Sequence, residues 1–487
     1  MKTLETILKE RGPSLSSELV SMMVMEQHIQ KDAARKRISR VQPPIRRLYG
    51  LNLPNRENFL YLDDQYKKPE FYDQLIESLK KTRSSYGRAL IGLEARNGII
   101  KRALFPIASG LPIFNTKGQV LHKYVEEKLI ELGIIEILHT LEGEFIGIAN
   151  CKEMSRRRQA CLIVESIVLS SIKSWLANMG FSSINAIDIS SDTIPTFGPF
   201  HWDLAAPSYL SGLADRAQGK VKNGFVVGDI ILNRLIKEED ILPFLSKCDA
   251  VKNQKNQRKF IPIFIADSFD APALGELRRR GILIARPATI FGDEIAEHLK
   301  NLIYTIENAA AALVKNPESV FQLVEKVGKI EGASQNLRGV VLEFIIGRIY
   351  SLDGYNIEIR QQVYSSRADR AEIDVKAVKS HEVVCIECKG KMPGNLVSRA
   401  EIEEWLDDSL PVIKSWLKNA DSLPDKKRFE FYTSTDYADD AKELIEKIRH
   451  EHKKQPISFL SGIDIVTKLR MLTQNSLVRI FTEQFVR

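Results

Sequence analysis

The chain has 487 residues, of which 44% are hydrophobic and 27% charged, and its formal net charge is +7. This composition excludes a disordered or low-complexity chain, and the length exceeds what one hydrophobic core usually organises, so we expect three or four folded domains. The modest positive charge is compatible with a nucleic-acid partner without being diagnostic of one.

Membrane insertion and disulfide bonding are not expected. No stretch approaches the roughly 18–20 apolar residues that cross a bilayer, and the N-terminus has no apolar signal core. Five cysteines offer no disulfide framework in a chain of this length. Cys385 and Cys388 would point to opposite faces of a strand, which argues against a shared metal. We therefore expect a cytoplasmic protein with no membrane partner.

Residues 1–66 are expected to form three helices and a hairpin. Apolar residues at helical spacing predict helices over 3–9, 15–25 and 30–41, followed by strands over 45–49 and 59–62. This arrangement resembles a winged helix-turn-helix, and the resemblance implies DNA contacts from the third helix and the hairpin. The basic residues concerned are Lys31, Arg35, Lys36, Arg37, Arg40, Arg46 and Arg47. The alternative is a basic helix that is only a solvated face.

Residues 67–150 resemble a second winged-helix unit. Its candidate recognition helix is 117–132, and its wing is 134–148. The helix also carries the acidic residues Glu126, Glu127 and Glu131, so a DNA-binding role is less expected than the fold itself. Tandem winged helices serve both as DNA-binding and as protein-contact modules.

Residues 151–310 are expected to form an α/β domain. An apolar helix over 159–176 carries one acidic residue, Glu165. Two later strand-like segments carry Asp203 and Asp229. A further strand over 260–266, a helix over 271–280 and a short strand over 281–285 complete the pattern.

Residues 311–487 contain the segment with the clearest chemistry. An apolar helix over 336–352 carries Glu343, and strand 357–364 precedes a second strand with Asp374. In the next strand, 383–389, the side chains of Cys385, Glu387 and Lys389 share one face. Charged groups on a buried strand need compensation. A divalent metal held by Asp374 and Glu387 would provide it and would leave Lys389 beside a reacting phosphate.

This order of helix with Glu, strand, strand with Asp and strand with Glu-x-Lys resembles the PD-(D/E)xK nuclease superfamily. Ile373 stands where the proline of the family name would be. The elements that follow, a strand over 429–435, a helix over 439–452 and a strand over 457–464, resemble the end of an Mrr-like catalytic domain. The resemblance covers 332–472, about a third of the chain.

The resemblance implies a DNA endonuclease that uses Mg²⁺ or Mn²⁺. Asp374 and Glu387 would hold the metal, Glu343 would assist, and Lys389 would meet the scissile phosphate. Flanking phosphates would meet three further basic residues, namely Arg367, Arg370 and Lys391. The alternative for Arg367 and Arg370 is a solvated loop, and Gly390 and Pro393 suggest that the strand is ending near Lys391. For the Glu–Lys pair the alternative is a surface pair on an unrelated α/β domain.

The third domain repeats the order of the fourth. Glu165 corresponds to Glu343, Asp203 to Asp374 and Asp229 to Glu387, but Ile231 stands at the lysine position. We therefore interpret 151–310 as a degenerate nuclease-like domain that binds DNA or packs against the active copy without cutting. The alternative is an unrelated α/β domain whose acids have no shared role.

The expected fold is thus multidomain α/β and α+β, with winged helices followed by two restriction-endonuclease-like α/β domains, the first of them degenerate. The boundaries are 1–66, 67–150, 151–310 and 311–487. Duplex DNA is the favoured partner, and bacterial defence against foreign DNA is the favoured setting. Three alternatives stay open: a DNA-binding regulator or adaptor with nuclease-like scaffolds, a repair or recombination nuclease, and an enzyme that is silent until a partner ATPase or an effector assembles it. A homodimer is a further partner that we consider.

Overall fold

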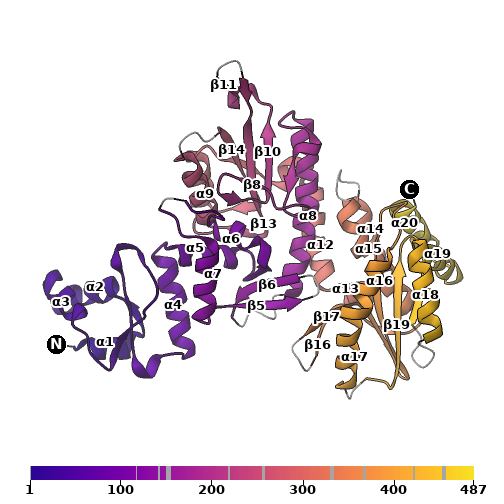
Figure 1. Ribbon diagram of the computed structural model, residues 1–487, viewed down its shortest axis with the longest axis horizontal. Coiled ribbons are helices and arrows are strands. Elements are labelled where there is room, and N and C mark those ends of the chain that lie inside the picture. The colour runs from indigo at the N-terminus through magenta and orange to yellow at the C-terminus, as the bar shows by residue number, and fades with distance from the viewer. Residues whose placement is uncertain are drawn as a thin grey trace.

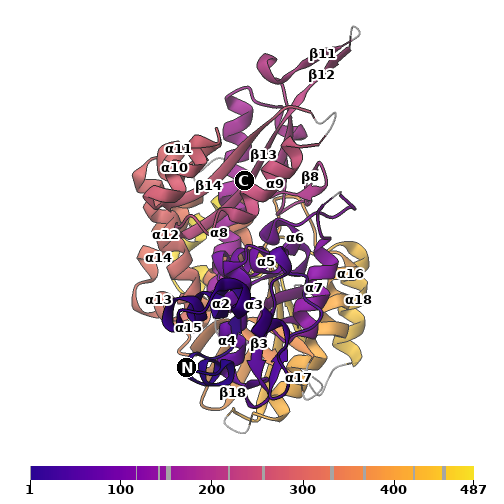
Figure 2. The same cartoon turned by 90° about the vertical axis from the view of Figure 1, so that its left-hand side faces the viewer.

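The computed structural model describes residues 2–116, 118–140, 143–149, 155–217, 220–254, 258–328, 334–365, 369–420, 423–451 and 457–486. Along the chain these residues form an N-terminal unit (2–66), a second unit (69–149), a third unit (155–307) and a C-terminal unit (309–486). The N-terminal unit lies at one end of the molecule and the C-terminal unit at the other, and Figure 2 gives the view along this axis (Figures 1 and 2).

The N-terminal unit has three helices and a three-stranded sheet of order β1-β3-β2. Its elements are α1 (Leu4–Arg11), β1 (Ser14–Leu15), α2 (Ser16–Gln27), α3 (Lys31–Ser39), β2 (Ile45–Arg47) and β3 (Phe59–Leu62). The Thr3 side chain accepts a hydrogen bond from the Thr6 backbone and so caps α1. In α3 only Ala34 and Ile38 are buried, and its basic side chains face outward.

The second unit has the same strand order, β4-β6-β5. Its elements are α4 (Pro69–Lys81), α5 (Ser85–Ala95), β4 (Ile99–Lys101), α6 (Phe105–Ser109), α7 (His122–Glu131), β5 (Ile135–Thr140) and β6 (Gly143–Ile148). The expected recognition helix over 117–132 is shorter in the structure, because α7 starts at His122, and Lys117 lies outside the described residues.

The third unit is built on a five-stranded sheet. Its elements are α8 (Ser155–Asn178), β7 (Asp188–Ile189), β8 (Thr196–Phe197), β9 (Phe200–His201), β10 (Leu204–Ser208), β11 (Asp215–Ala217), β12 (Lys220–Lys222), β13 (Gly224–Ile236), α9 (Leu242–Lys252), β14 (Phe260–Phe269), α10 (Ala271–Arg279), β15 (Leu283–Ala285), α11 (Pro287–Phe291) and α12 (Asp293–Glu307). The hairpin β11–β12 projects away from this sheet (Figure 1).

The C-terminal unit is built on a second five-stranded sheet. Its elements are α13 (Ala309–Lys315), α14 (Pro317–Gly328), α15 (Ser334–Leu352), β16 (Asn356–Tyr364), β17 (Arg370–Lys379), β18 (Glu382–Lys389), α16 (Arg399–Glu404), a π-helical turn (Trp405–Ser409), α17 (Leu410–Lys418), β19 (Lys426–Thr433), α18 (Asp439–Glu451), β20 (Ile457–Leu460), α19 (Gly462–Met471) and α20 (Asn475–Phe485). β18 is buried along nearly its whole length, as expected for a strand with helices on both faces of its sheet.

The two large sheets have the same topology. Their strand orders are β15-β14-β13-β10-β7 and β20-β19-β18-β17-β16 when read in the same sense. In each sheet the first two pairings in chain order are antiparallel and the last two are parallel. The long helix before each sheet, α8 or α15, occupies the same place in the order of elements.

One hydrophobic core joins the third and C-terminal units. Helix α8 contacts both α12 and α15, and α14 contacts both α12 and α15. Buried side chains such as Ile172 and Leu302 of the third unit belong to the same cluster as Leu323 and Ile346 of the C-terminal unit. The expected boundary near 310 is therefore a boundary between repeats within one packed body.

Helix α8 corrects one expectation. Its segment Arg157–Asn178 is long and apolar enough to cross a membrane by length and composition, although no such stretch was expected. Most of this segment is buried, and the helix packs against α12, α15 and β13. It therefore fits the core helix of a folded unit.

Candidate active site

Strand pairing brings Asp374 and Glu387 to one point. In the β17–β18 ladder, Val375 pairs with Ile386, and the next position along both strands is Asp374 opposite Glu387. The ladder stops there. The Asp374 carboxylate accepts a hydrogen bond from the backbone N–H of Cys388, at 2.7 Å, so the strands separate around the two acids.

Glu343 reaches the same place from α15. It lines a cavity of about 210 Å³ together with Asp374, Glu387 and Lys389. Both of its oxygens accept hydrogen bonds from the Arg360 guanidinium, each at 2.7 Å. Arg360 has a positive φ of 55°, and it interrupts the β16–β17 pairing between Ile359 and Gln361. This local twist of β16 accompanies the turn of its side chain toward the acids.

Lys389 forms an ion pair with Glu387, at 2.8 Å between the ammonium and the carboxylate. The Lys389 side chain is about one third exposed, whereas Glu387 is largely buried. The four residues expected to form the site, Glu343, Asp374, Glu387 and Lys389, are therefore gathered around one small cavity.

The acids of this cavity outnumber its cations. Glu372, Glu401 and Glu404 also line it. Burial raises the pKa of Asp374 well above its usual range, and repulsion from Glu387 and Glu343 raises it further. Burial likewise raises the pKa of Glu387, and the attraction of Lys389 only partly offsets this. For Lys389, burial opposes the charged form, but attraction by Glu387 and Asp374 outweighs it and raises the pKa.

These acids have the chemistry of a hard-cation site, although their side chains do not yet surround one. Within the described ranges, no three Asp, Glu, His or Cys side chains are grouped closely enough to hold a metal ion. The reason is local, because Glu343 is held by Arg360 and Glu387 is held by Lys389. Asp374 has no ion-pair partner among the described residues. Its raised pKa means that burial and the neighbouring acids disfavour its charged form, which a bound divalent cation would stabilise.

The third unit carries acids in the same register. Leu204 pairs with Gly228 in the β10–β13 ladder, so Asp203 and Asp229 occupy the next opposed position. The backbone N–H of Ile230 donates to the Asp203 carboxylate at 3.0 Å, as Cys388 does to Asp374. Glu165 lies on α8, the counterpart of α15.

In the third unit, however, each acid is matched by a basic side chain. Arg96, at the C-terminal end of α5, contacts Asp203 at 2.7 Å, and Lys247 of α9 contacts Asp229 at 2.6 Å. Arg158 donates twice to Glu165, at 3.0 and 2.9 Å. All six side chains are buried. Protein cations thus compensate these carboxylates, and one of the cations comes from the second unit.

The lysine position of the third unit is occupied by Ile231, which is buried in the core. Lys247 does not take over a lysine's role in catalysis, since its side chain is fully buried and its ammonium lies over the Trp202 ring at 4.2 Å. Burial disfavours the charged form of Asp203, but Arg96 outweighs it and lowers the pKa of this acid. This shift is opposite in sign to that of Asp374.

Some of the residues expected to bind nucleic acid are exposed, whereas others are bound to protein groups. Lys31, Arg35, Lys36, Arg37 and Arg40 are exposed on or just after α3. Arg46 is also exposed but pairs with Asp63 at 2.7 Å. Arg47 donates to the carbonyls of Ile38 and Ser39 at 2.9 and 2.8 Å, so its role is to cap the end of α3.

The three basic residues expected near the catalytic strands are not grouped. The Arg370 guanidinium lies 5.0 Å from the centre of the Tyr364 ring. Strand β18 ends at Lys389, and the Lys391 ammonium beyond it forms an ion pair with the Glu401 carboxylate at 2.5 Å. Arg367 lies outside the described residues.

Sequence reasoning missed Arg360, Glu372 and the cations of the third unit. Arg360 lies in the middle of an alternating strand pattern, and nothing in that pattern predicts its positive φ. Arg96 and Lys247 belong to elements far from the acids in sequence. A signal was present for Glu372, because its spacing of two from Asp374 places both side chains on one face of β17.

Two solved structures are similar to parts of this chain, both at low TM-scores. A protein of unknown function, AF1548, is 14% identical, with a TM-score of 0.20, over 30% of this chain and 95% of that one. MspJI restriction endonuclease, in complex with a 27-mer oligonucleotide, is 13% identical, with a TM-score of 0.19, over 36% of this chain and 35% of that one. No protein-family model matches the sequence, and comparison with curated proteins finds no significant match.

Proposed function

We propose that the protein is a metal-dependent DNA endonuclease whose single hydrolytic centre lies in the C-terminal unit. The observation that carries this proposal is the convergence of Glu343, Asp374, Glu387 and Lys389 on one cavity, with the charge of Asp374 left uncompensated. The third unit matches each of its buried acids with a protein cation, whereas Asp374 has no such cation among the described residues, and an unmatched acid of this kind is costly unless a ligand compensates it.

In this proposal Asp374 and Glu387 supply the oxygen ligands, and Glu343 joins them once it leaves Arg360. A bound Mg²⁺ or Mn²⁺ supplies charge stabilisation at the phosphate and lowers the pKa of the attacking water. Lys389, partly exposed at the mouth of the cavity, donates to a non-bridging phosphate oxygen and stabilises the negative charge of the transition state. Its raised pKa keeps it charged at neutral pH.

Affinity for duplex DNA comes, in this proposal, from the winged-helix-like N-terminal unit, where α3 presents its exposed basic face. The third unit, with its acids matched by protein cations, takes no part in hydrolysis. Action against foreign DNA in the cytoplasm is the setting that we favour for such an enzyme.

The test is cleavage of plasmid and linear DNA in Mg²⁺ or Mn²⁺. We expect activity in the wild type and a loss of about 100-fold or more in Asp374→Asn and in Lys389→Met, because each removes a group needed in the transition state. Asp203→Asn in the third unit, the counterpart of Asp374, is the matched control, and it should retain cleavage per folded molecule. Activity that survives both C-terminal substitutions, or that disappears only in the control, would refute the assignment.

A second candidate is a nuclease that stays silent until a partner or effector binds, and one observation favours it. The bidentate Arg360–Glu343 contact holds one of the expected metal ligands away from any metal. If this second candidate is right, the wild-type protein alone cleaves DNA slowly, and the substitution Arg360→Gln raises the rate of cleavage.

A further inference from the structure

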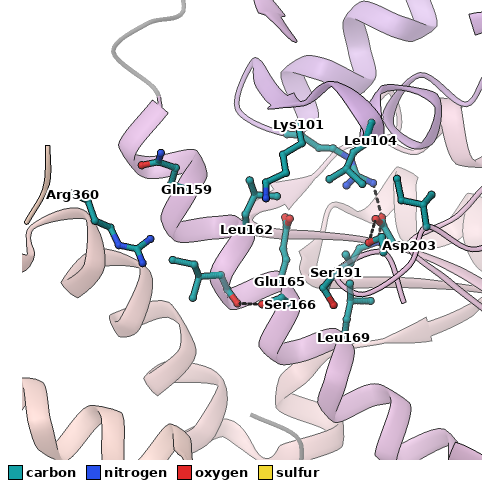
Figure 3. A pocket seen from close by; sticks show the side chains of 16 residues that line it. Lys101, Leu104, Gln159, Leu162, Glu165, Ser166, Leu169, Ser191, Asp203 and Arg360 are labelled. Carbon is teal, nitrogen blue, oxygen red and sulfur yellow. Dashed lines mark hydrogen bonds and ion pairs between the residues drawn. The ribbon is translucent and has the colours of Figure 1, made fainter. Parts of the chain in front are cut away.

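A second cavity lies where three units meet. Its volume is about 410 Å³, and it is lined by residues of the second unit, of α8 and the strands of the third unit, and by Arg360 of the C-terminal unit (Figure 3). This volume is within the range of sites for small organic ligands. Nothing in the proposed hydrolysis uses this cavity.

The lining of the cavity is apolar on one part and charged on another. Leu104, Leu162 and Ile194 are among its apolar members. Lys101 and Arg360 approach it from different sides (Figure 3). Such a lining suits a ligand with one flat apolar portion and one anionic group.

The net charge of the cavity is positive. Its two acids, Glu165 and Asp203, are already matched by Arg158 and Arg96. Among the residues that the structure describes, Lys101 has no carboxylate partner, so its ammonium charge is uncompensated at the wall of the cavity. An anion would compensate it.

Gln159 adds a side-chain amide whose oxygen has no hydrogen-bond partner in the described part of the chain. Its side chain is buried, with 7% exposure, and lines the cavity from α8. One end of its amide donates to Glu372 of β17 at 3.2 Å, whereas the other end, Oε1, has no hydrogen-bond partner. A buried amide of this kind calls for a partner from a ligand, and the edge of a nucleobase offers the matching donor.

We propose that this cavity binds a nucleotide unit, with the phosphate at Lys101 and Arg360, the base against the apolar wall and the base edge at Gln159. The unit is either a free nucleotide or one nucleotide of a DNA strand, because both carry the same chemistry.

Binding of a nucleotide in this cavity would also affect the proposed active site. Arg360 lines both this cavity and the cavity of Asp374, and Glu372 connects Gln159 to the second of these. A phosphate in the larger cavity attracts the guanidinium of Arg360 and loosens its hold on Glu343. This coupling rests on the proposed nuclease function, whereas the binding itself does not.

Binding is tested by calorimetry on the full-length protein without metal, so that the result is independent of cleavage. The probes are dAMP, deoxyadenosine and a short 5′-phosphorylated single-stranded oligonucleotide. We expect dAMP or the oligonucleotide to bind, deoxyadenosine to bind at least about tenfold more weakly, and Lys101→Met to weaken the binding by about tenfold or more. Lys123→Met, an exposed lysine of the second unit outside the cavity, is the matched control and should leave it unchanged.

A second variant, Leu162→Trp, fills the cavity without removing a charge and should also abolish binding. Tight binding of dAMP supports a free nucleotide, and binding of the oligonucleotide alone supports a strand. The proposal is overturned if neither probe binds below about 1 mM, if deoxyadenosine binds as well as dAMP, or if both folded variants bind as the wild type does. Loss of cleavage in Asp374→Asn with nucleotide binding intact separates this site from the hydrolytic one.

Discussion

Asp203 and Asp374 occupy equivalent positions where a strand ladder ends, and the surroundings shift their pKa values in opposite directions. Arg96 lowers the pKa of Asp203 against the effect of burial, whereas burial and neighbouring acids raise that of Asp374. The backbone contact is the same at both positions, so the difference comes from the side chains around them. A single cation therefore distinguishes a carboxylate already compensated by the protein from one whose charge, under the proposed function, a metal would compensate.

The pH dependence of cleavage should reflect the raised pKa values of the two proposed metal ligands, Asp374 and Glu387. Asp374 and Glu387 have raised pKa values, so each binds a proton more readily in the folded protein and loses its capacity as a ligand as pH falls. We expect the acidic limb of kcat/KM to lie above the ordinary carboxyl range near about 4. We expect it to move to lower pH as Mg²⁺ is increased, because metal and protons compete. A limb that stays fixed across Mg²⁺ concentrations would count against these two ligands.

The same residues make a prediction about stability. In the absence of metal, Asp374→Asn should stabilise the folded protein at neutral pH by on the order of 1 kcal/mol, because it removes a buried, uncompensated charge. Arg96→Met should destabilise it by about 3–5 kcal/mol, because Asp203 is left buried without its partner. Urea unfolding measures both. The double variant Arg96→Met with Asp203→Asn should recover part of the loss, and equal losses in the single and double variants would contradict the pairing.

At the scale of elements, the basic residues of α3 and those of the following strand β2 are used differently by the fold. Lys36 and Arg40 point outward from the region of α3, whereas Arg47 is bound to the last carbonyls of that helix. The sequence shows the charges of all three but cannot show which of them the fold already uses.

Substitutions should separate these roles. Lys36→Ala and Arg40→Ala should weaken DNA binding across sequences and reduce the salt slope by about 1 for each lost phosphate contact. Arg47→Ala should instead lower the unfolding midpoint, because it leaves two carbonyls without their donor. Fluorescence anisotropy at several salt concentrations measures the first effect. Lys315→Ala, at an exposed position at the end of α13, is the control. Unchanged salt slopes in both α3 variants would exclude this helix from the interface.

The sequence predicts individual elements better than their contacts. The expected helix over 336–352 is α15, Ser334–Leu352, and the expected strand over 357–364 is β16, Asn356–Tyr364. The first is a long, mostly apolar segment and the second alternates apolar and polar residues in its first half, and both patterns can be recognised from the local sequence. Arg360, Gln159 and Arg96 could not be anticipated, because each acts through a partner in another element or unit.

At the scale of the whole molecule, the shared core means that the two repeats are not independent folding units. Helices α8, α12, α14 and α15 pack together between the two sheets. Separation near residue 310 would expose the apolar faces of these helices to water.

Unfolding should therefore be cooperative across the repeats. We expect Trp202 of the third unit and Trp405 of the C-terminal unit to report the same urea midpoint when each is the fluorescent probe in a variant lacking the other tryptophans. The N-terminal unit has its own core, so a probe placed there is free to differ. Two midpoints separated by more than about 0.5 M urea would mean that the repeats unfold separately.

The chain has two sheets of the same topology, but under the proposed function only one of them carries a hydrolytic centre. Two such centres would cut both strands of a duplex in a single encounter, whereas Ile231 and the buried cation partners of the third unit would leave the second strand uncut. Each encounter should then end in a nick. Supercoiled circles should accumulate as relaxed circles before any linear product, and a full break would require a second visit or a second copy of the chain.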